Sequence, residues 1–172
     1  HTLAIFEAGI SQPGEMENLE AVIQPTIGVL TNIGEAHSSG FNSKEQKEFE
    51  KRILFRNVKK QLPELVVLEK IQKGTTTNII AEKKINGPVE VSIEIPFTDE
   101  ASIQNAITCW KVLLFLGYND EIIKSRMKLL MPVNMRLELK KGINGCVIIN
   151  DSYSADISSL EIALNFLEQQ SP

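Results

Sequence analysis

Apolar runs alternate with amphipathic stretches along most of this chain. The short runs have the length of buried strands and predict strands at residues 2–7, 27–31, 65–68, 77–82, 89–95, 135–140 and 145–150. Apolar residues that recur with the helical period predict helices at residues 15–23, 43–61, 99–117, 120–131 and 157–169. Buried strands that alternate with helices indicate an α/β fold with a mostly parallel sheet flanked by helices.

Two local signals mark the boundaries of elements. Ser43 and Gln46 form a capping-box pattern, which predicts that a helix begins there. Asn86-Gly87 stands between two apolar runs and predicts the tight turn of a β-hairpin.

A domain boundary is expected close to Pro132. A helix ends there, proline cannot continue it, and a new strand follows. We therefore expect one domain at residues 1–133 and the beginning of a second at residues 134–172. The chain starts at a histidine that runs directly into a strand-like stretch, so we expect both ends to continue in a longer parent chain.

The composition narrows the class of protein. The chain has 172 residues and a net charge of −4, so it lacks the basic surface typical of proteins that bind nucleic acid or anionic membranes. No apolar run reaches the roughly 18 residues of a membrane span, and no secretory signal is present. Cys109 and Cys146 lie in unrelated segments, and we expect them to be reduced core thiols of a cytoplasmic protein.

Glu7 and His37 each follow a predicted strand. Ligands of parallel sheets bind outside the carboxyl ends of the strands, so these side chains face one cleft if the two strands are near neighbours. An acid, an imidazole and a further oxygen ligand are suited to a divalent metal ion. The alternatives are a solvated loop acid and a structural or exposed histidine.

Lys51 lies in the apolar stripe of the helix predicted at 43–61, together with Leu54 and Phe55. Burial disfavours the charged amine and lowers its pKa. A neutral amine reacts with carbon dioxide to give a carbamate, which is a carboxylate on a long arm and suits Mg²⁺. Lys51 can instead be a lysine whose amine reaches water from the edge of the stripe. Lys47 lies one turn earlier on the same side, and spacing alone does not choose between the two lysines.

Three further polar residues are candidates for nucleotide contacts. Asn105, on a predicted helix, carries an amide that can read a purine edge, although most helical asparagines face water. Arg136 precedes a strand and can bind a phosphate through two parallel hydrogen bonds, and Asp151 ends a strand. Singly, Arg136 and Asp151 are equally compatible with a surface charge or a helix cap. The chain contains no Gly-Lys pair, so the phosphate loop of an ATP enzyme would lie elsewhere.

The order and spacing of several motifs closely resemble the central domain of the Mur ligase family. These motifs are Glu7-Ala8-Gly9, the segment from Thr31-Asn32-Ile33-Gly34-Glu35-Ala36-His37 to Phe41, Lys51-Arg52-Ile53-Leu54-Phe55, Asn105-Ala106, Met135-Arg136-Leu137 and Asn150-Asp151-Ser152-Tyr153. The last of them resembles the start of the family's carboxy-terminal domain. The Asp-Ser-Tyr and His-x-x-Gly-Phe forms are most similar to the members that add D-alanyl-D-alanine, including those fused to an alanine racemase.

The resemblance implies a truncated central domain of the P-loop-NTPase type, followed by the beginning of a Rossmann-like domain. It also implies roles for the matching residues. Glu7, His37 and Lys51 would be the catalytic residues and would hold Mg²⁺, with Lys51 as a carbamate. ATP would be contacted by Asn32, Asn105, Arg136 and Asp151.

The implied activity is that of an ATP-dependent acid–amino-acid ligase of peptidoglycan synthesis. A carboxylate of UDP-MurNAc-tripeptide would be activated as an acyl phosphate and then attacked by the amine of D-alanyl-D-alanine. The missing segment of the central domain would supply the phosphate loop. The absent N-terminal and C-terminal domains of the parent chain would supply the sugar site and the selection of the amine. We therefore expect this chain alone to be inactive. Alternatives are another ligase of the superfamily, including one similar to folylpolyglutamate synthase, and a non-catalytic nucleotide-binding module.

Overall fold

The computed structural model describes residues 2–31, 33, 40–84, 87–153 and 157–169. The chain divides into two compact units, one of residues 1–61 and one of residues 62–172. Within the described ranges, no helix combines the length and the apolar character that crossing a bilayer requires.

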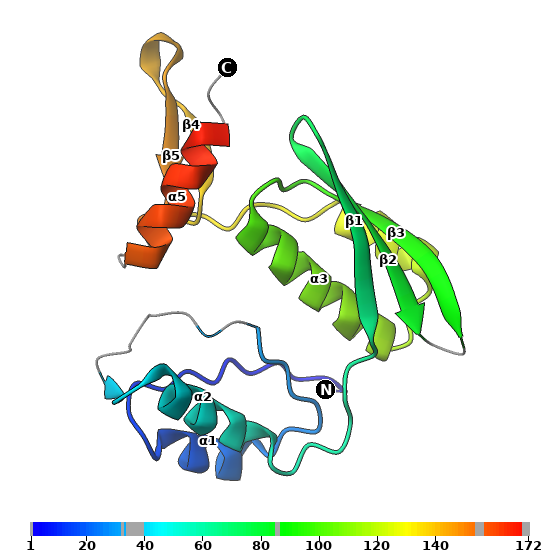
Figure 1. The fold of residues 1–172 in the computed structure, drawn as a ribbon, viewed down its shortest axis with the longest axis vertical. Helices are drawn as coiled ribbons and strands as arrows, with labels where there is room; N and C mark the ends of the chain where they lie inside the picture. Colours follow the sequence, from blue (N-terminus) through cyan, green and yellow to red (C-terminus); the bar gives the residue numbers. More distant parts are fainter. Residues whose placement is uncertain (1, 32, 34–39, 85–86, 154–156, 170–172) are drawn as a thin grey trace. The chain divides into compact units, whose positions relative to one another are not determined.

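The first unit contains two helices and a single turn of 3₁₀-helix. Helix α1 spans Glu15–Ile23, α2 spans Lys44–Arg52, and the 3₁₀ turn η2 spans Ile53–Phe55 (Figure 1). The predicted cap of α2 is confirmed, because the Ser43 hydroxyl accepts a hydrogen bond from the backbone N–H of Gln46 at 3.2 Å. The helix predicted at residues 43–61 is too long, since α2 and η2 end at Phe55.

The strands predicted at residues 2–7 and 27–31 are not regular strands. Within the described chain, the β-pairing of these segments is limited to an isolated parallel bridge between Ile27 and Lys60. Ile5 is 89% exposed and Phe6 65% exposed. Apolar composition predicted the strands, but a strand also needs a hydrogen-bonded neighbour, and these segments have no ladder partner among the described residues.

A three-stranded antiparallel sheet organises the second unit. Its strands are β1 (Leu65–Lys73), β2 (Thr76–Lys84) and β3 (Pro88–Ile95), in the order β1-β2-β3 (Figure 1). The predicted hairpin is confirmed as the pairing of β2 with β3. The β1–β2 hairpin was missed. Its turn contains Gly74, with a φ of 59° that glycine adopts without steric cost.

The prediction of a mostly parallel sheet is wrong. Both sheets in the described chain are antiparallel, because β4 (Glu138–Lys141) and β5 (Val147–Asn150) also pair antiparallel, around the turn η3 (Ile143–Gly145). The physical reason is the small number of residues that connects each strand to the next. Parallel neighbours need a crossover of a dozen or more residues, whereas these strands follow one another after short turns.

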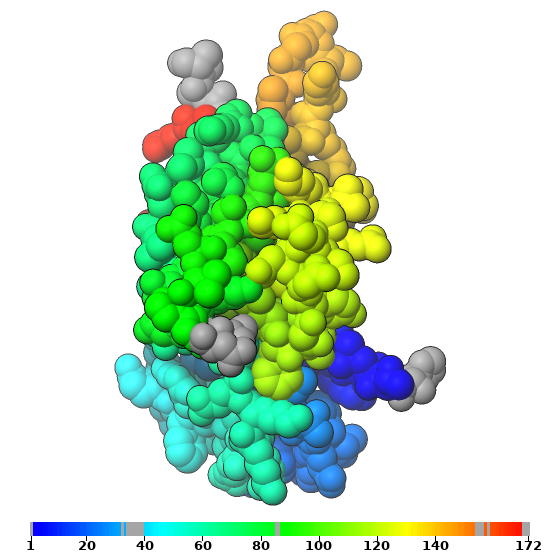
Figure 2. Space-filling view, turned by 90° about the vertical axis from the view of Figure 1, so that its right-hand side faces the viewer, coloured from blue at the N-terminus to red at the C-terminus, as the bar shows by residue number. Residues whose placement is uncertain are grey.

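Two helices cover one face of the three-stranded sheet. Helix α3 spans Glu100–Phe115 and α4 spans Asp120–Met127, so both predicted helices exist and α4 is shorter than expected. Strands β2 and β3 bury alternate residues, and β1 buries Leu65. These form one core with side chains of the helices: Leu65, Ile79, Ala81, Val91, Ile93, Ile95, Ile103, Ala106, Ile107, Trp110, Leu114, Ile123 and Met127. Figure 2 shows α4 lying directly beside β3 on the surface.

Helix α5 spans Ile157–Gln169, as predicted from its amphipathic pattern. The expectation of core thiols is wrong, because Cys109 and Cys146 are both free and exposed. Cys109 lies on α3 beside the fully buried Trp110, so it faces away from the core that its neighbour enters.

Asp99 caps α3 from a nearly buried position. Its side chain accepts a hydrogen bond from the backbone N–H of Ser102 at 2.8 Å. We expect Asp99→Ala to lower the free energy of unfolding by about 0.5–2 kcal/mol, because the first turn of α3 loses this acceptor. Asp99→Asn keeps an acceptor oxygen and should lose less. Denaturant unfolding followed by Trp110 fluorescence measures both, and equal losses in the two variants would contradict the capping role.

Candidate functional site

Segments that carry predicted site residues meet on a small apolar core in the first unit. Ile10, Met16 and Ile53 are buried there, and Ala8 and Phe41 pack against them. Glu7 immediately precedes Ala8, and Lys51 lies two residues before Ile53. The side chain of Glu7 is exposed. The predicted residues Asn32 and His37 lie outside the described residues.

Two close contacts tie these segments together. A Cβ atom on Gly40 would lie 1.8 Å from the carbonyl oxygen of Ser11, so only glycine fits this approach. The backbone N–H of Gly14 donates to Oε2 of Glu50 at 2.9 Å, which links the loop before α1 to α2. The loop that follows Glu7 is therefore anchored on one side to α2 and on the other to Gly40.

The two competing lysines of α2 differ in burial. Lys47 is only 3% exposed, whereas Lys51 is half-buried together with Leu54 and Phe55. The residues of the predicted stripe are thus only partly buried, and the deepest lysine is the one that sequence reasoning placed second. Burial depends on what packs over each position, and the helical period does not contain that information.

A complete metal site is not formed by the described residues alone. Among them, no three His, Cys, Asp or Glu side chains lie close enough to hold an ion. Of the predicted set, Glu7 is an exposed residue and Lys51 a half-buried one. A carboxylate oxygen is a ligand that suits Mg²⁺, so Glu7 fits the predicted role by its chemistry.

In the second unit, Asn105 is exposed on α3, away from the buried residues Ile103, Ala106 and Ile107. Its amide is therefore accessible to a ligand. A contact with adenine stays a prediction.

Arg136 and Asp151 lie at the open end of the β4–β5 hairpin, where the chain enters β4 and leaves β5. The backbone N–H of Leu137 donates to Oδ1 of Asp151 at 3.1 Å, and the N–H of Tyr153 donates to the carbonyl oxygen of Met135 at 3.1 Å. The guanidinium carbon of Arg136 lies 4.2 Å from the centroid of the Tyr153 ring. The structure thus brings together, at one end of the hairpin, two residues that were predicted separately.

The backbone on either side of Arg136 has an unusual conformation. Met135 has a φ of 64° and Leu137 a φ of 46°, both in the left-handed region. Residues with a Cβ rarely adopt it, and each instance costs about 1–3 kcal/mol unless its surroundings enforce it. The contacts of this turn with Asp151 and Tyr153 provide that enforcement.

Tyr153 received no role from sequence reasoning, although it belongs to the Asp-Ser-Tyr motif. Glu138 was also missed. Its Oε2 accepts hydrogen bonds from the Met135 N–H at 3.2 Å and the Asn150 amide at 3.2 Å, and it pairs with Lys140 at 3.1 Å. The available signal was the position of Glu138, two residues after Arg136 and at the start of a short strand, which places both at the hairpin entrance.

Glu138 makes the hairpin sensitive to acid. The hydrogen bond from the Met135 N–H, and then the contact with Lys140, lower the pKa of Glu138 below its ordinary value of 4.5. A carboxyl whose pKa is lower in the folded state stabilises above its unfolded pKa, and this stabilisation is lost as the pH falls through the folded pKa. We therefore expect cross-strand NMR signals of β4 and β5 to weaken below about pH 4.5. Glu138→Gln should remove this transition, whereas Glu161→Gln on α5 should retain it.

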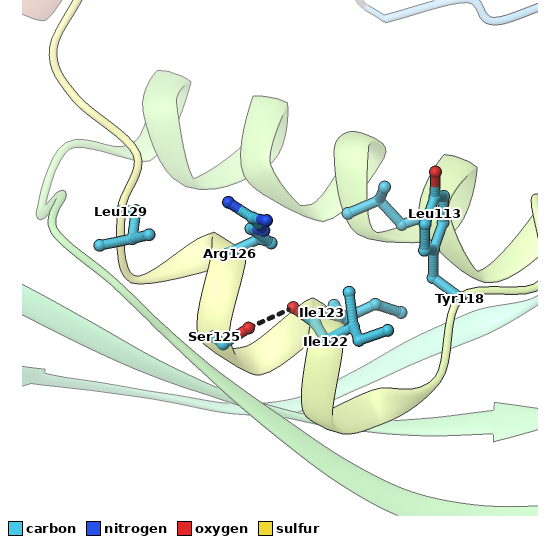
Figure 3. Close-up of a pocket in the computed structure, with 7 residues that line it drawn as sticks. All are labelled: Leu113, Tyr118, Ile122, Ile123, Ser125, Arg126 and Leu129. Carbon is cyan, nitrogen blue, oxygen red and sulfur yellow. Dashed lines mark hydrogen bonds between the residues drawn. The ribbon is translucent and has the colours of Figure 1, made fainter.

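A groove between α3 and α4 contains none of the predicted site residues. It has a volume of about 550 Å³ and is lined by Leu113, Tyr118, Ile122, Ile123, Ser125, Arg126 and Leu129 (Figure 3). The Ser125 hydroxyl donates to the carbonyl oxygen of Ile122 at 2.8 Å. With neither a carboxylate nor an imidazole in its lining, the groove does not match the predicted metal chemistry.

A family comparison matches most of the chain. The family model described as "Mur ligase middle domain" matches residues 1–135. UDP-N-acetylmuramoyl-tripeptide–D-alanyl-D-alanine ligase of Buchnera aphidicola (subspecies Baizongia pistaciae) is 25% identical over 98% of this chain and 43% of its own length. The protein of the same name from Bacillus subtilis is 26% identical over 96% of this chain and 41% of its own length.

A solved structure has a similar fold. A crystal structure of MurF from Acinetobacter baumannii superposes with a TM-score of 0.78 at 20% identity, covering 95% of this chain and 42% of that one. The chain therefore spans less than half the length of the relatives that it matches.

Proposed function

The chain belongs to the Mur ligase middle-domain family, whose members are ATP-dependent peptide ligases. On that premise, we propose that it is part of a ligase that adds D-alanyl-D-alanine to UDP-MurNAc-tripeptide. One observation carries this proposal. Curated proteins with that activity in their names align with 95–98% of the chain, in organisms as different as Buchnera, Borreliella and Bacillus.

In this proposal, Arg136 contacts the ATP phosphates, and Asp151 orders the turn that carries Arg136. Asn105 contacts adenine, and Asn32 is a further residue that binds the nucleotide. Support comes from the Arg136 turn, where Asp151 binds the backbone beside the arginine, and from the exposure of Asn105. A guanidinium fork matches phosphate oxygens because it offers parallel N–H donors.

The residues proposed to hold Mg²⁺ are Glu7, His37 and Lys51 as a carbamate. When bound, the ion would neutralise phosphate oxygens that otherwise repel the attacking carboxylate. Support comes from the shared core, on which the segments of Glu7 and Lys51 pack. Lys51 is itself half-buried on α2.

The rest of the parent protein completes the proposed enzyme. The chain spans about two fifths of its relatives, so we place the rest of the enzyme in other parts of the parent, a cytoplasmic protein. The missing segment of the central domain carries the phosphate loop, and flanking domains carry the sugar site and the site for the incoming amine. Residues 1–133 would then be most of the central domain, and residues 134–172 the beginning of the carboxy-terminal domain.

The test is product formation by the full-length parent. Purified protein is incubated with ATP, Mg²⁺, UDP-MurNAc-tripeptide and D-alanyl-D-alanine, and the pentapeptide product and inorganic phosphate are measured. The proposal expects equal amounts of both products. A product formed only with a different amino acid would assign another ligase of the superfamily, and nucleotide binding without any product would assign a non-catalytic module.

A further inference from the structure

One face of the Arg136 guanidinium is covered by an aromatic ring. Tyr153 lies under it at 4.2 Å, a distance typical of a cation–π interaction. Such stacking occupies the face of the planar group and leaves the N–H donors at its edge available. The ring therefore restricts where the guanidinium lies without using its hydrogen-bonding capacity.

The neighbouring carboxylates are already engaged by other donors. Oε2 of Glu138 accepts from the Met135 N–H and from Asn150, and pairs with Lys140. Oδ1 of Asp151 accepts from the Leu137 N–H. Neither forms an ion pair with Arg136, and no other carboxylate within the described ranges does so. The donor edge of Arg136 thus remains available for an external anion.

The backbone at Tyr153 is fixed to the same turn. Its N–H donates to the Met135 carbonyl oxygen at 3.1 Å, one residue before Arg136. The ring and the arginine are therefore joined twice, once through the backbone and once through the side chains. These two contacts fix the position of the Tyr153 ring relative to the Arg136 guanidinium, although β4 and β5 lie between the two residues in the sequence.

We propose that Tyr153 is the positioning residue of Arg136, which holds the guanidinium with its donor edge presented to a phosphate group. That the anion is a phosphate rests on the proposed function, whereas the positioning itself rests on the contacts within the hairpin. Tyr153 affects phosphate binding only by holding Arg136 in place. The aromatic ring of Tyr153, and not its hydroxyl, holds the guanidinium.

The experiment uses the 172-residue chain labelled with ¹⁵N. The Arg136 Nε–H signal is assigned by its absence in Arg136→Lys, and inorganic pyrophosphate is then titrated into the wild type, Tyr153→Phe, Tyr153→Leu and Tyr153→Ala. In the wild type and Tyr153→Phe, we expect the signal to be displaced by the ring current and to shift further with pyrophosphate. In Tyr153→Leu and Tyr153→Ala, the ring-current displacement disappears and pyrophosphate binds about two- to fivefold more weakly.

Controls keep folding separate from positioning. Cross-strand signals of Leu139 and Ile149 report whether the hairpin is intact, and Tyr118→Ala removes an exposed tyrosine elsewhere in the same unit. An unchanged Arg136 signal and unchanged binding in Tyr153→Leu would overturn the proposal, as would loss of the hairpin in both Tyr153→Leu and Tyr153→Ala. Absence of pyrophosphate binding by the wild type, with the ring-current effect intact, would overturn the phosphate role of Arg136 and leave the positioning supported.

Discussion

Ile123→Ala is expected to lower the free energy of unfolding of the second unit by about 2–5 kcal/mol. Ile123 is 1% exposed and belongs to the core between α4 and the sheet. Truncation removes buried methylene and methyl groups and leaves a cavity that a close-packed core fills only in part. Chemical denaturation followed by Trp110 fluorescence measures the loss, because Trp110 is the sole tryptophan and lies in the same core.

The adjacent residue provides a matched control. Ile122 lies on the same helix but is 44% exposed. Ile122→Ala makes the same chemical change and the same gain in helix propensity, so the difference between the two variants reports burial alone. We expect Ile122→Ala to change stability by no more than about 0.5–1 kcal/mol. Similar losses in the two variants would mean that α4 does not pack against the sheet through Ile123.

Lys51→Ala is expected to lower the rate of product formation by the parent enzyme at least about 100-fold, by analogy with the loss of one group that stabilises transition-state charge. Lys51→Arg should be equally impaired, since a guanidinium keeps the positive charge but forms no carbamate. The assay is the pentapeptide measurement proposed above, at saturating ATP. Activity of Lys51→Arg close to that of the wild type would exclude the carbamate and assign Lys51 as a simple cation.

Lys47→Ala separates burial from catalysis. Because Lys47 is 3% exposed, loss of its packed stem should lower the free energy of unfolding by about 1–3 kcal/mol. Lys51→Ala should change stability less, since Lys51 is only half-buried. If the folded fraction of Lys47→Ala is inactive while Lys51→Ala retains activity, Lys47 is the catalytic lysine and Lys51 is not.

Most of the helices and part of the β-structure could be predicted because their signals are local. The Ser43 cap of α2 and the Asp99 cap of α3 each involve a residue only three positions away. The β2–β3 hairpin likewise depends on a turn between adjacent segments. The prediction failed where a local signal was absent, as for residues 2–7, whose apolar composition does not supply a hydrogen-bonded neighbour.

The candidate site likewise has features that the sequence shows and features that only the structure shows. The identity and order of Glu7, Lys51, Arg136 and Asp151 are visible in the sequence, and they suffice to indicate the family and a phosphate chemistry. The contact between Arg136 and Tyr153 is not visible, because a whole hairpin separates the two residues. Nor does helical spacing show that Lys47 lies deeper than Lys51.

The sequence alone therefore determined the helices, one hairpin and the types of residue available for chemistry, because backbone preferences and caps act over a few positions. Only the tertiary structure decided the antiparallel direction of the sheets, the burial of each lysine and the pairing of Arg136 with Tyr153. These features depend on which distant segments meet, and the free energy of such contacts is set by packing and by loss of water across the whole unit.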